Sequence, residues 1–247
     1  AAPLALAAGE TGLPFAALVV SEPDDVSATA TVTITDGMDK GDFTASSAAG
    51  FVRSVAGRDV VYTLVLLAQS EVGTLLQIAL RSLVFQPAAQ PPGSATTTMI
   101  TLSASFAGLG APAPLSVGVV TTSPLNPFAQ LDVQDANPDA MVTVTVSLPP
   151  GSTGHYVDLG IGAAGADPLN YVVSGTAAQV SAALHAVSFV PNAGSTVPGG
   201  YSARVLGDGN HARLVDGGTG RNALSATDTT DTLVGGAGAD TIYAAPK

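Results

Sequence analysis

Side chains that carry oxygen recur at a fixed interval near the end of the sequence. Residues 217–243 divide into three blocks of nine: GGTGRNALS (217–225), ATDTTDTLV (226–234) and GGAGADTIY (235–243). The sixth residue of each block bears a carboxylate or amide oxygen: Asn222, Asp231 and Asp240. Ca²⁺ takes about six to eight such hard oxygens, and glycines let backbone carbonyls turn toward the same ion. The spacing therefore predicts an internal repeat whose turns could hold a divalent cation.

These blocks resemble the haemolysin-type (RTX) calcium-binding nonapeptide, GGxGxDxUx, in which U is apolar. The third block matches it completely, the first has Asn222 in place of aspartate, and the middle block keeps only Asp231 and Leu233. In that family two nonapeptides form one coil of a right-handed parallel β-roll, so blocks one and three should stack on one side. The resemblance implies Ca²⁺ as cofactor and nine metal-site residues: Gly217, Gly218, Gly220, Asn222, Asp231, Gly235, Gly236, Gly238 and Asp240. We expect at most one good site, because the middle block lacks the glycines and Asn222 brings no charge.

Other polar groups could also bind a cation. The acidic turn 22–25 and the group Asp132, Asp135 and Asp139 could hold calcium at a junction between modules, with a solvated turn as the alternative interpretation. The same alternative applies to the D-x-x-D-x-x-D series of Asp36, Asp39 and Asp42. The three histidines, His155, His185 and His211, lie far apart in the sequence, and none has the H-x-x-x-H spacing of a zinc site.

Two pairs of matching segments indicate how the preceding chain is built. Residues 13–35 and 126–148 share a Pro-Phe-Ala triplet, an acidic turn and an alternation of threonine with aliphatic residues, which predicts a half-buried strand. Residues 73–87 and 177–191 change from helical spacing to alternation, which predicts a short helix followed by a strand. Further strands are expected near 59–67, 96–106, 115–122, 155–161, 169–174 and 201–206. Many short strands between turn residues favour β-sandwich domains.

The order of these features resembles the cadherin-like and immunoglobulin-like modules repeated in large bacterial surface proteins, with the first copy the more divergent. The resemblance implies an all-β fold with two Ig/cadherin-like β-sandwich domains and a short C-terminal parallel β-roll segment. The expected boundaries are an N-terminal arm (1–12), module 1 (13–122), module 2 (123–214) and an RTX-like tail (215–247).

Composition limits the possible partners. The formal net charge is −11 and there are two lysines, so no basic patch for nucleic acid or an anionic membrane can form. Charged residues make up 11%, against about 25% in ordinary soluble proteins. The absence of cysteine excludes disulfides, thiolate zinc sites and cysteine nucleophiles. The apolar runs are too short to cross a bilayer, so we expect no membrane insertion and a divalent cation as the favoured partner.

The sequence thus predicts a secreted, calcium-binding structural or adhesive module at a bacterial cell surface, with a host or cell-surface ligand as partner. It carries no G-x-S-x-G elbow, P-loop or dinucleotide fingerprint, so we expect no enzymatic activity. One alternative is a self-assembling subunit of an S-layer or extracellular filament, in which the apolar arm AAPLALAAG lacks a partner and adds a strand to a neighbour. Nothing in the sequence favours the third, a carbohydrate-binding or hydrolytic domain.

Overall fold

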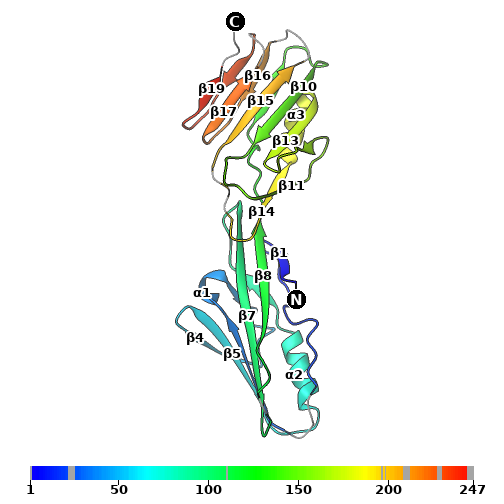
Figure 1. Cartoon of the computed structure of the whole chain (residues 1–247), viewed down its shortest axis with the longest axis vertical. Coiled ribbons are helices and arrows are strands. Elements are labelled where there is room, and N and C mark those ends of the chain that lie inside the picture. The colour runs from blue at the N-terminus through cyan, green and yellow to red at the C-terminus, as the bar shows by residue number, and fades with distance from the viewer. Residues whose placement is uncertain are drawn as a thin grey trace. The chain divides into compact units, whose positions relative to one another are not determined.

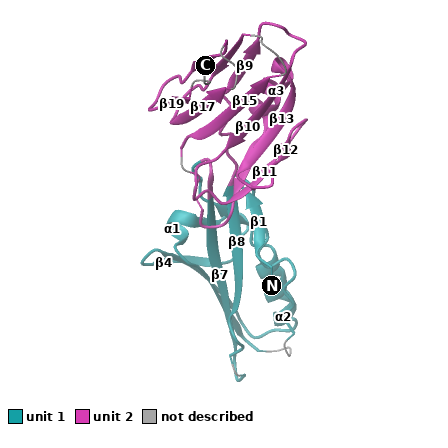
Figure 2. Cartoon of the chain, turned by 45° about the horizontal axis from the view of Figure 1, so that its top comes forward, with its two compact units in different colours: residues 1–91, 95–122 teal, residues 92–94, 123–247 magenta. Residues whose placement is uncertain are grey.

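The computed structural model describes residues 2–21, 26–109, 111–195, 197, 199–207, 212–226 and 230–243. The acidic turn 22–25 and His211 therefore lie outside the described residues. The chain divides into two compact units, coloured separately in Figure 2. Unit 1 comprises residues 1–91 and 95–122, and unit 2 comprises residues 92–94 and 123–247. Within the described residues, strands make up most of the regular structure, so the expected all-β class is confirmed.

Unit 1 is built on a six-stranded sheet with the order β1-β8-β7-β2-β5-β4, and β3 pairs with β6 in a smaller sheet (Figure 1). Its strands are β1 (Leu4–Ala7), β2 (Ala28–Ile34), β3 (Gly41–Phe43), β4 (Val52–Ala56), β5 (Asp59–Leu66), β6 (Phe85–Pro87), β7 (Ser94–Phe106) and β8 (Leu115–Ser123). Its helices are α1 (Gly37–Lys40) and α2 (Val72–Arg81).

Alternation along β2 creates the core of unit 1. Ala28, Ala30, Val32 and Ile34 are buried, while the intervening threonines are half-buried, as a strand with one face on the core requires. Helix α2 adds apolar residues at helical spacing, and the rest of the core comes from β1, β3, β5, β6, β7 and β8 and from Phe15, Ala48 and Leu83.

Unit 2 also has a six-stranded sheet, with the order β12-β13-β10-β15-β17-β19. Two smaller sheets accompany it, one of β11 and β14 and one with the order β18-β16-β9. Its strands are β9 (Asp132–Asp135), β10 (Met141–Ser147), β11 (Gly154–Val157), β12 (Ala163–Ala164), β13 (Asn170–Thr176), β14 (Ser188–Pro191), β15 (Tyr201–Gly207), β16 (Arg213–Asp216), β17 (Asn222–Ala226), β18 (Thr232–Val234) and β19 (Thr241–Tyr243). Its helix is α3 (Ala177–Ala186).

The two units repeat the same series of elements. In each, a central strand (β2 or β10) pairs with a strand that leads into a helix, α2 or α3, and a short strand follows the helix. Phe85 on β6 and Phe189 on β14 are fully buried at equivalent places. The helix-to-strand change expected in 73–87 and 177–191 is confirmed. Thr176 begins α3 with a capping box, in which its side chain and that of Gln179 exchange hydrogen bonds with backbone amides.

Two expectations need correction. The N-terminal arm does have a partner, because β1 pairs parallel to β8 with Leu4 opposite Val119. The strand expected over 155–161 ends earlier, since β11 stops at Val157 and Asp158 has a left-handed backbone with φ of 56°. The segment 36–43 is regular, and holds α1 and β3.

Candidate cation site in the C-terminal coil

The C-terminal blocks form a parallel coil in the register of two nonapeptides. Strand β19 pairs parallel to β17, with Thr241 opposite Ala223 and Ile242 opposite Leu224. Strands β18 and β16 pair with the same shift, and an isolated parallel bridge joins Thr219 to Ala237. Block one therefore lies beside block three, and the apolar eighth position is inside in block one, where Leu224 is fully buried. Strand β17 also pairs with β15, so the coil continues the sheet of unit 2.

Glycine is required in the turns by the close approach of neighbouring coils. A Cβ atom at Gly236 would overlap the carbonyl oxygen of Gly218, and one at Gly238 would overlap that of Gly220. Gly236 also has a φ of 82°, in the region that side chains disfavour. These glycines would be needed to stack the turns whether or not an ion binds.

The side-chain amide of Asn222 donates two hydrogen bonds inside the turn of block one. Its side chain is buried, and Nδ2 donates to the carbonyls of Gly217 at 2.9 Å and Thr219 at 3.3 Å. The hydroxyl of Tyr201 donates to the same Gly217 oxygen at 2.6 Å. Two carbonyls that could face a cation thus already accept N–H and O–H groups from the chain.

Block three contributes the carboxylate of Asp240 to this turn, and Asp216, just before block one, accepts the backbone N–H of Gly218 at 2.9 Å. Asp240 Oδ1 accepts the backbone N–H of Asn222 at 2.8 Å, which ties block three to block one. Burial raises the pKa of Tyr201, and the negative charges of Asp216 and Asp240 raise it further. The phenol therefore stays protonated as a donor.

Two side-chain oxygens remain as candidate ligands. Asn222 Oδ1 is buried and has no hydrogen-bond partner, and Asp240 Oδ2 receives no hydrogen bond from the described residues. A buried oxygen without a donor is costly, and a cation would satisfy it. Among the described residues, no three carboxylates, histidines or cysteines gather as a metal-binding group. These two oxygens, one neutral and one from a carboxylate, are the candidate ligands that the stacked turns offer to a cation.

Asp231, the equivalent residue of the middle block, has a different role. Its carboxylate binds Arg213, with Nη1 at 3.1 Å from Oδ1 and 3.2 Å from Oδ2. Arg213 Nε donates to Asp135 Oδ2 at 3.0 Å. The side chains of Arg213 and Asp135 are 0% exposed and that of Asp231 is 1% exposed. A Cβ at Gly207 would overlap the guanidinium, so this glycine makes room for it.

Asp231 and Asp135 were both expected as candidate cation ligands, and in the structure an arginine is the cation they bind. Sequence reasoning missed Arg213. The available signal was a single arginine in an otherwise apolar alternation, RLVD at 213–216, next to the start of the repeat.

The three aspartates of the D-x-x-D-x-x-D series in unit 1 also bind cationic side chains. Asp36 lies 3.2 Å from Lys40 Nζ, Arg58 binds Asp39, and Arg53 Nη2 lies 2.9 Å from Asp42 Oδ2. These contacts favour an ion-paired surface turn over a metal site.

Asp42 has a second partner in Tyr62, whose hydroxyl donates to Asp42 Oδ1 at 2.6 Å. Burial, together with this hydrogen bond, raises the pKa of Tyr62 to about 12.

The junction acids and histidines do not converge either. Asp132 Oδ1 lies 3.4 Å from His185 Nε2, and both side chains are partly exposed. Asp139 is exposed and donates its backbone N–H to the side chain of Asn137, as in a polar turn. His155 lies exposed on β11.

None of the described helices combines the length and apolarity needed to cross a membrane. No protein-family model matches the chain, and no curated protein does either.

Proposed function

We propose that this chain is a secreted structural or adhesive module of a bacterial cell-surface protein, in which a short β-roll binds one calcium ion. Two Ig/cadherin-like β-sandwiches would form the body of the module, and the coil would extend the sheet of the second one. The observation that carries the calcium proposal is the buried, unpartnered Oδ1 of Asn222, which lies in the block that pairs with Asp240. The parallel register of two nonapeptides supports the β-roll.

In this proposal Asp240 supplies the charge of the site and Asn222 Oδ1 a neutral ligand. Bound calcium would supply the positive charge that offsets burying these oxygens. With Asp240 as the one carboxylate assigned to the site, affinity should be weak, in the range of about 10⁻⁴–10⁻³ M that suits extracellular modules. The ion would order the last coil, whose strands β18 and β19 lie at sheet edges. The role is mechanical, and no catalytic step is assigned to the chain.

The test is a calcium titration of the whole chain by calorimetry, with amide hydrogen exchange of residues 230–243 as the structural readout. We expect saturable binding at millimolar calcium and slower exchange in β19. Asp240→Asn should abolish both. Asp158→Asn is the matched control, because it removes one exposed carboxylate from a left-handed turn position that asparagine also tolerates.

Binding that survives Asp240→Asn would refute the assignment to this turn. Loss of binding in a variant of the junction acids, Asp132→Asn with Asp139→Asn, would move the ion to the module junction. No heat and no added protection at 10-fold excess over about 10⁻³ M would refute calcium binding altogether.

The second candidate is a self-assembling subunit of a surface layer or filament. The observation that favours it is the position of β1 at the open edge of the unit 1 sheet, joined to β8 alone. A four-residue apolar edge strand is a suitable element for exchange between copies. Deletion of residues 1–9 should then abolish oligomers seen by light scattering, and oligomers that persist after the deletion would exclude strand exchange.

A further inference from the structure

The duplication within the chain shows one place where the two units differ. In unit 2, β9 follows the Pro-Phe-Ala triplet and pairs antiparallel to β16, with Val133 opposite Val215. The equivalent segment of unit 1 is residues 18–21, since Leu18 and Val20 correspond to Leu131 and Val133 in the matching sequences. Among the described residues of unit 1, this segment belongs to no ladder. The described part of unit 1 therefore has the counterpart of β9 without a counterpart of β16.

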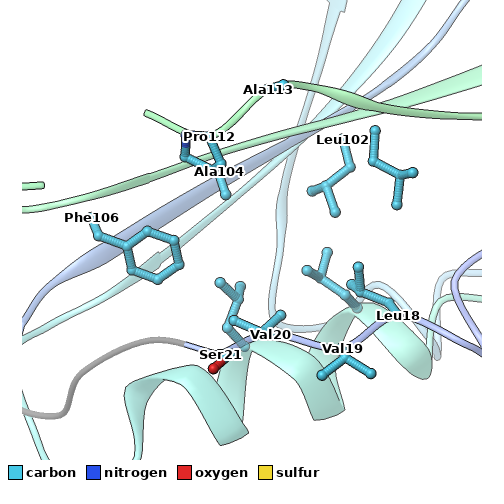
Figure 3. Close-up of a pocket in the computed structure, with 12 residues that line it drawn as sticks. Leu18, Val19, Val20, Ser21, Leu102, Ala104, Phe106, Pro112 and Ala113 are labelled. Atoms are coloured by element: carbon cyan, nitrogen blue, oxygen red, sulfur yellow. The ribbon is translucent and has the colours of Figure 1, made fainter. Parts of the chain in front are cut away.

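Residues 18–21, which correspond to β9, line an open apolar groove. Its volume is about 380 Å³, and apart from Ser21 its lining residues are all apolar. Figure 3 shows Leu102, Ala104 and Phe106 of β7 facing the segment 18–21, with Pro112 and Ala113 nearby. Helix α2 contributes Leu76 and Leu80.

In unit 2 the corresponding space is filled by the chain itself. Gly207 on β15 is the residue opposite Val142, and the guanidinium of Arg213 lies against Gly207. The unit 1 groove is lined by apolar side chains, among them Ala104 of β7, so it suits a strand that carries aliphatic side chains.

The backbone of residues 18–21 is held with one edge toward α2. Val20 N donates to Gln77 Oε1 at 2.9 Å, and Leu18 O accepts from Arg81 Nε at 2.6 Å. In unit 2 Val133 N makes the equivalent bond to Ser181 of α3, while β16 pairs on the other edge of β9.

Successive peptide groups of an extended strand point to opposite edges, so the groups of Val19 and Ser21 face away from α2. Within the part of the chain that the structure describes, neither residue's backbone takes part in a hydrogen bond. Val19 is also 72% exposed and Leu115, across the groove, 39% exposed.

We infer that unit 1 binds an extended peptide strand of another polypeptide in this groove, antiparallel to residues 18–21. The strand would pair with the peptide groups of Val19 and Ser21, and would place aliphatic side chains at alternate positions against Ala104 and Leu102. We infer a strand as the occupant because, in unit 2, β16 of the same chain pairs antiparallel to β9, the counterpart of residues 18–21. The inference does not depend on calcium binding.

The probe is a labelled, acetylated and amidated peptide, Ala-Val-Leu-Val-Asp-Gly, which copies residues 212–217 with valine in place of Arg213. Fluorescence anisotropy should show saturable binding to the whole chain. Amide exchange should slow at Val19 and Ser21 and stay unchanged at Val20, whose N–H is already bonded to Gln77. A peptide of the same sequence with N-methyl groups on alternate residues should bind at least tenfold more weakly, because it cannot donate to the strand edge.

Ala104→Leu should fill the groove and weaken binding at least tenfold. Ser103→Leu is the matched control, since residue 103 is exposed on the opposite face of the same strand, and it should leave binding unchanged. Absence of saturable binding overturns the inference. So does equal binding of the N-methylated peptide, which would indicate an apolar-ligand site without strand pairing. Self-association of the chain that Ala104→Leu abolishes would replace the foreign peptide with a second copy of this chain as the occupant.

Discussion

Arg213 should be the residue on which the stability of unit 2 depends most. Replacing it with methionine keeps the aliphatic stem and removes the charge, which leaves Asp135 and Asp231 buried without a cation. Loss of one partner from a buried ion pair costs about 3–5 kcal/mol. Total stabilities are only about 5–15 kcal/mol, so Arg213→Met should remove a large part of the stability of unit 2. No discount for solvent applies, because the side chains of all three residues are 0–1% exposed.

The assay is urea unfolding followed by amide exchange in residues 132–135 and 213–216, which reports on unit 2 alone. Arg204→Met is the matched control, because Arg204 is exposed on β15, and its loss should change stability by less than about 0.5 kcal/mol. Adding Asp135→Asn and Asp231→Asn to the Arg213 variant should recover most of the loss, since no uncompensated charge remains. A loss under about 1 kcal/mol for Arg213→Met, or no recovery in the triple variant, would refute the reasoning.

Three further outcomes follow from the same structure. Gly207→Ala should cost about 1–3 kcal/mol by overpacking against Arg213, and the cost measured by urea unfolding should fall in the Arg213→Met background. Without calcium, Asn222→Asp should lower the stability of the coil by about 1–3 kcal/mol, because it removes two buried N–H donations and adds a second negative charge. In thermal unfolding, millimolar calcium should raise the midpoint temperature of Asn222→Asp more than that of the wild type. The phenol of Tyr62 should titrate near pH 12 by NMR, and Asp42→Asn should lower that pKa only in part, because burial is its larger cause. Because the folded-state pKa is raised, this contribution to stability is present below about pH 10 and is lost as pH rises toward 12.

Local patterns in the sequence predicted the local structure well. The alternation of threonine with aliphatic residues identified β2 and β10, and the change of period identified α2 and α3 with their following strands. The ninefold spacing predicted which strands of the coil would be neighbours, because a period of nine fixes the register once two blocks make a coil.

Long-range pairings could not be read in the same way. The arm was expected to be free because its partner β8 is more than a hundred residues away, and no local pattern links the two. The burial of Arg213 depends on Asp135, which lies 78 residues earlier and was itself interpreted as a candidate calcium ligand or part of a solvated turn. The sequence predicted Asn222 as an uncharged ligand, yet its donor role depends on which amide atom faces Gly217.

The addition of β16 and β17 to unit 2 has a consequence for the order in which the chain folds. Strand β9 acquires its ladder partner only when residues 213–216 are present, and Asp135 then also gains its counter-charge. Val215 and Leu224 belong to the same core as Phe128 and Val144. During synthesis on the ribosome, the segment 123–207 therefore keeps an exposed apolar face until residues 213–226 emerge, whereas unit 1 has all of its strands once residue 123 has emerged. Closure of unit 2 is a late, high-contact-order step, and the repeat serves as the segment that completes it.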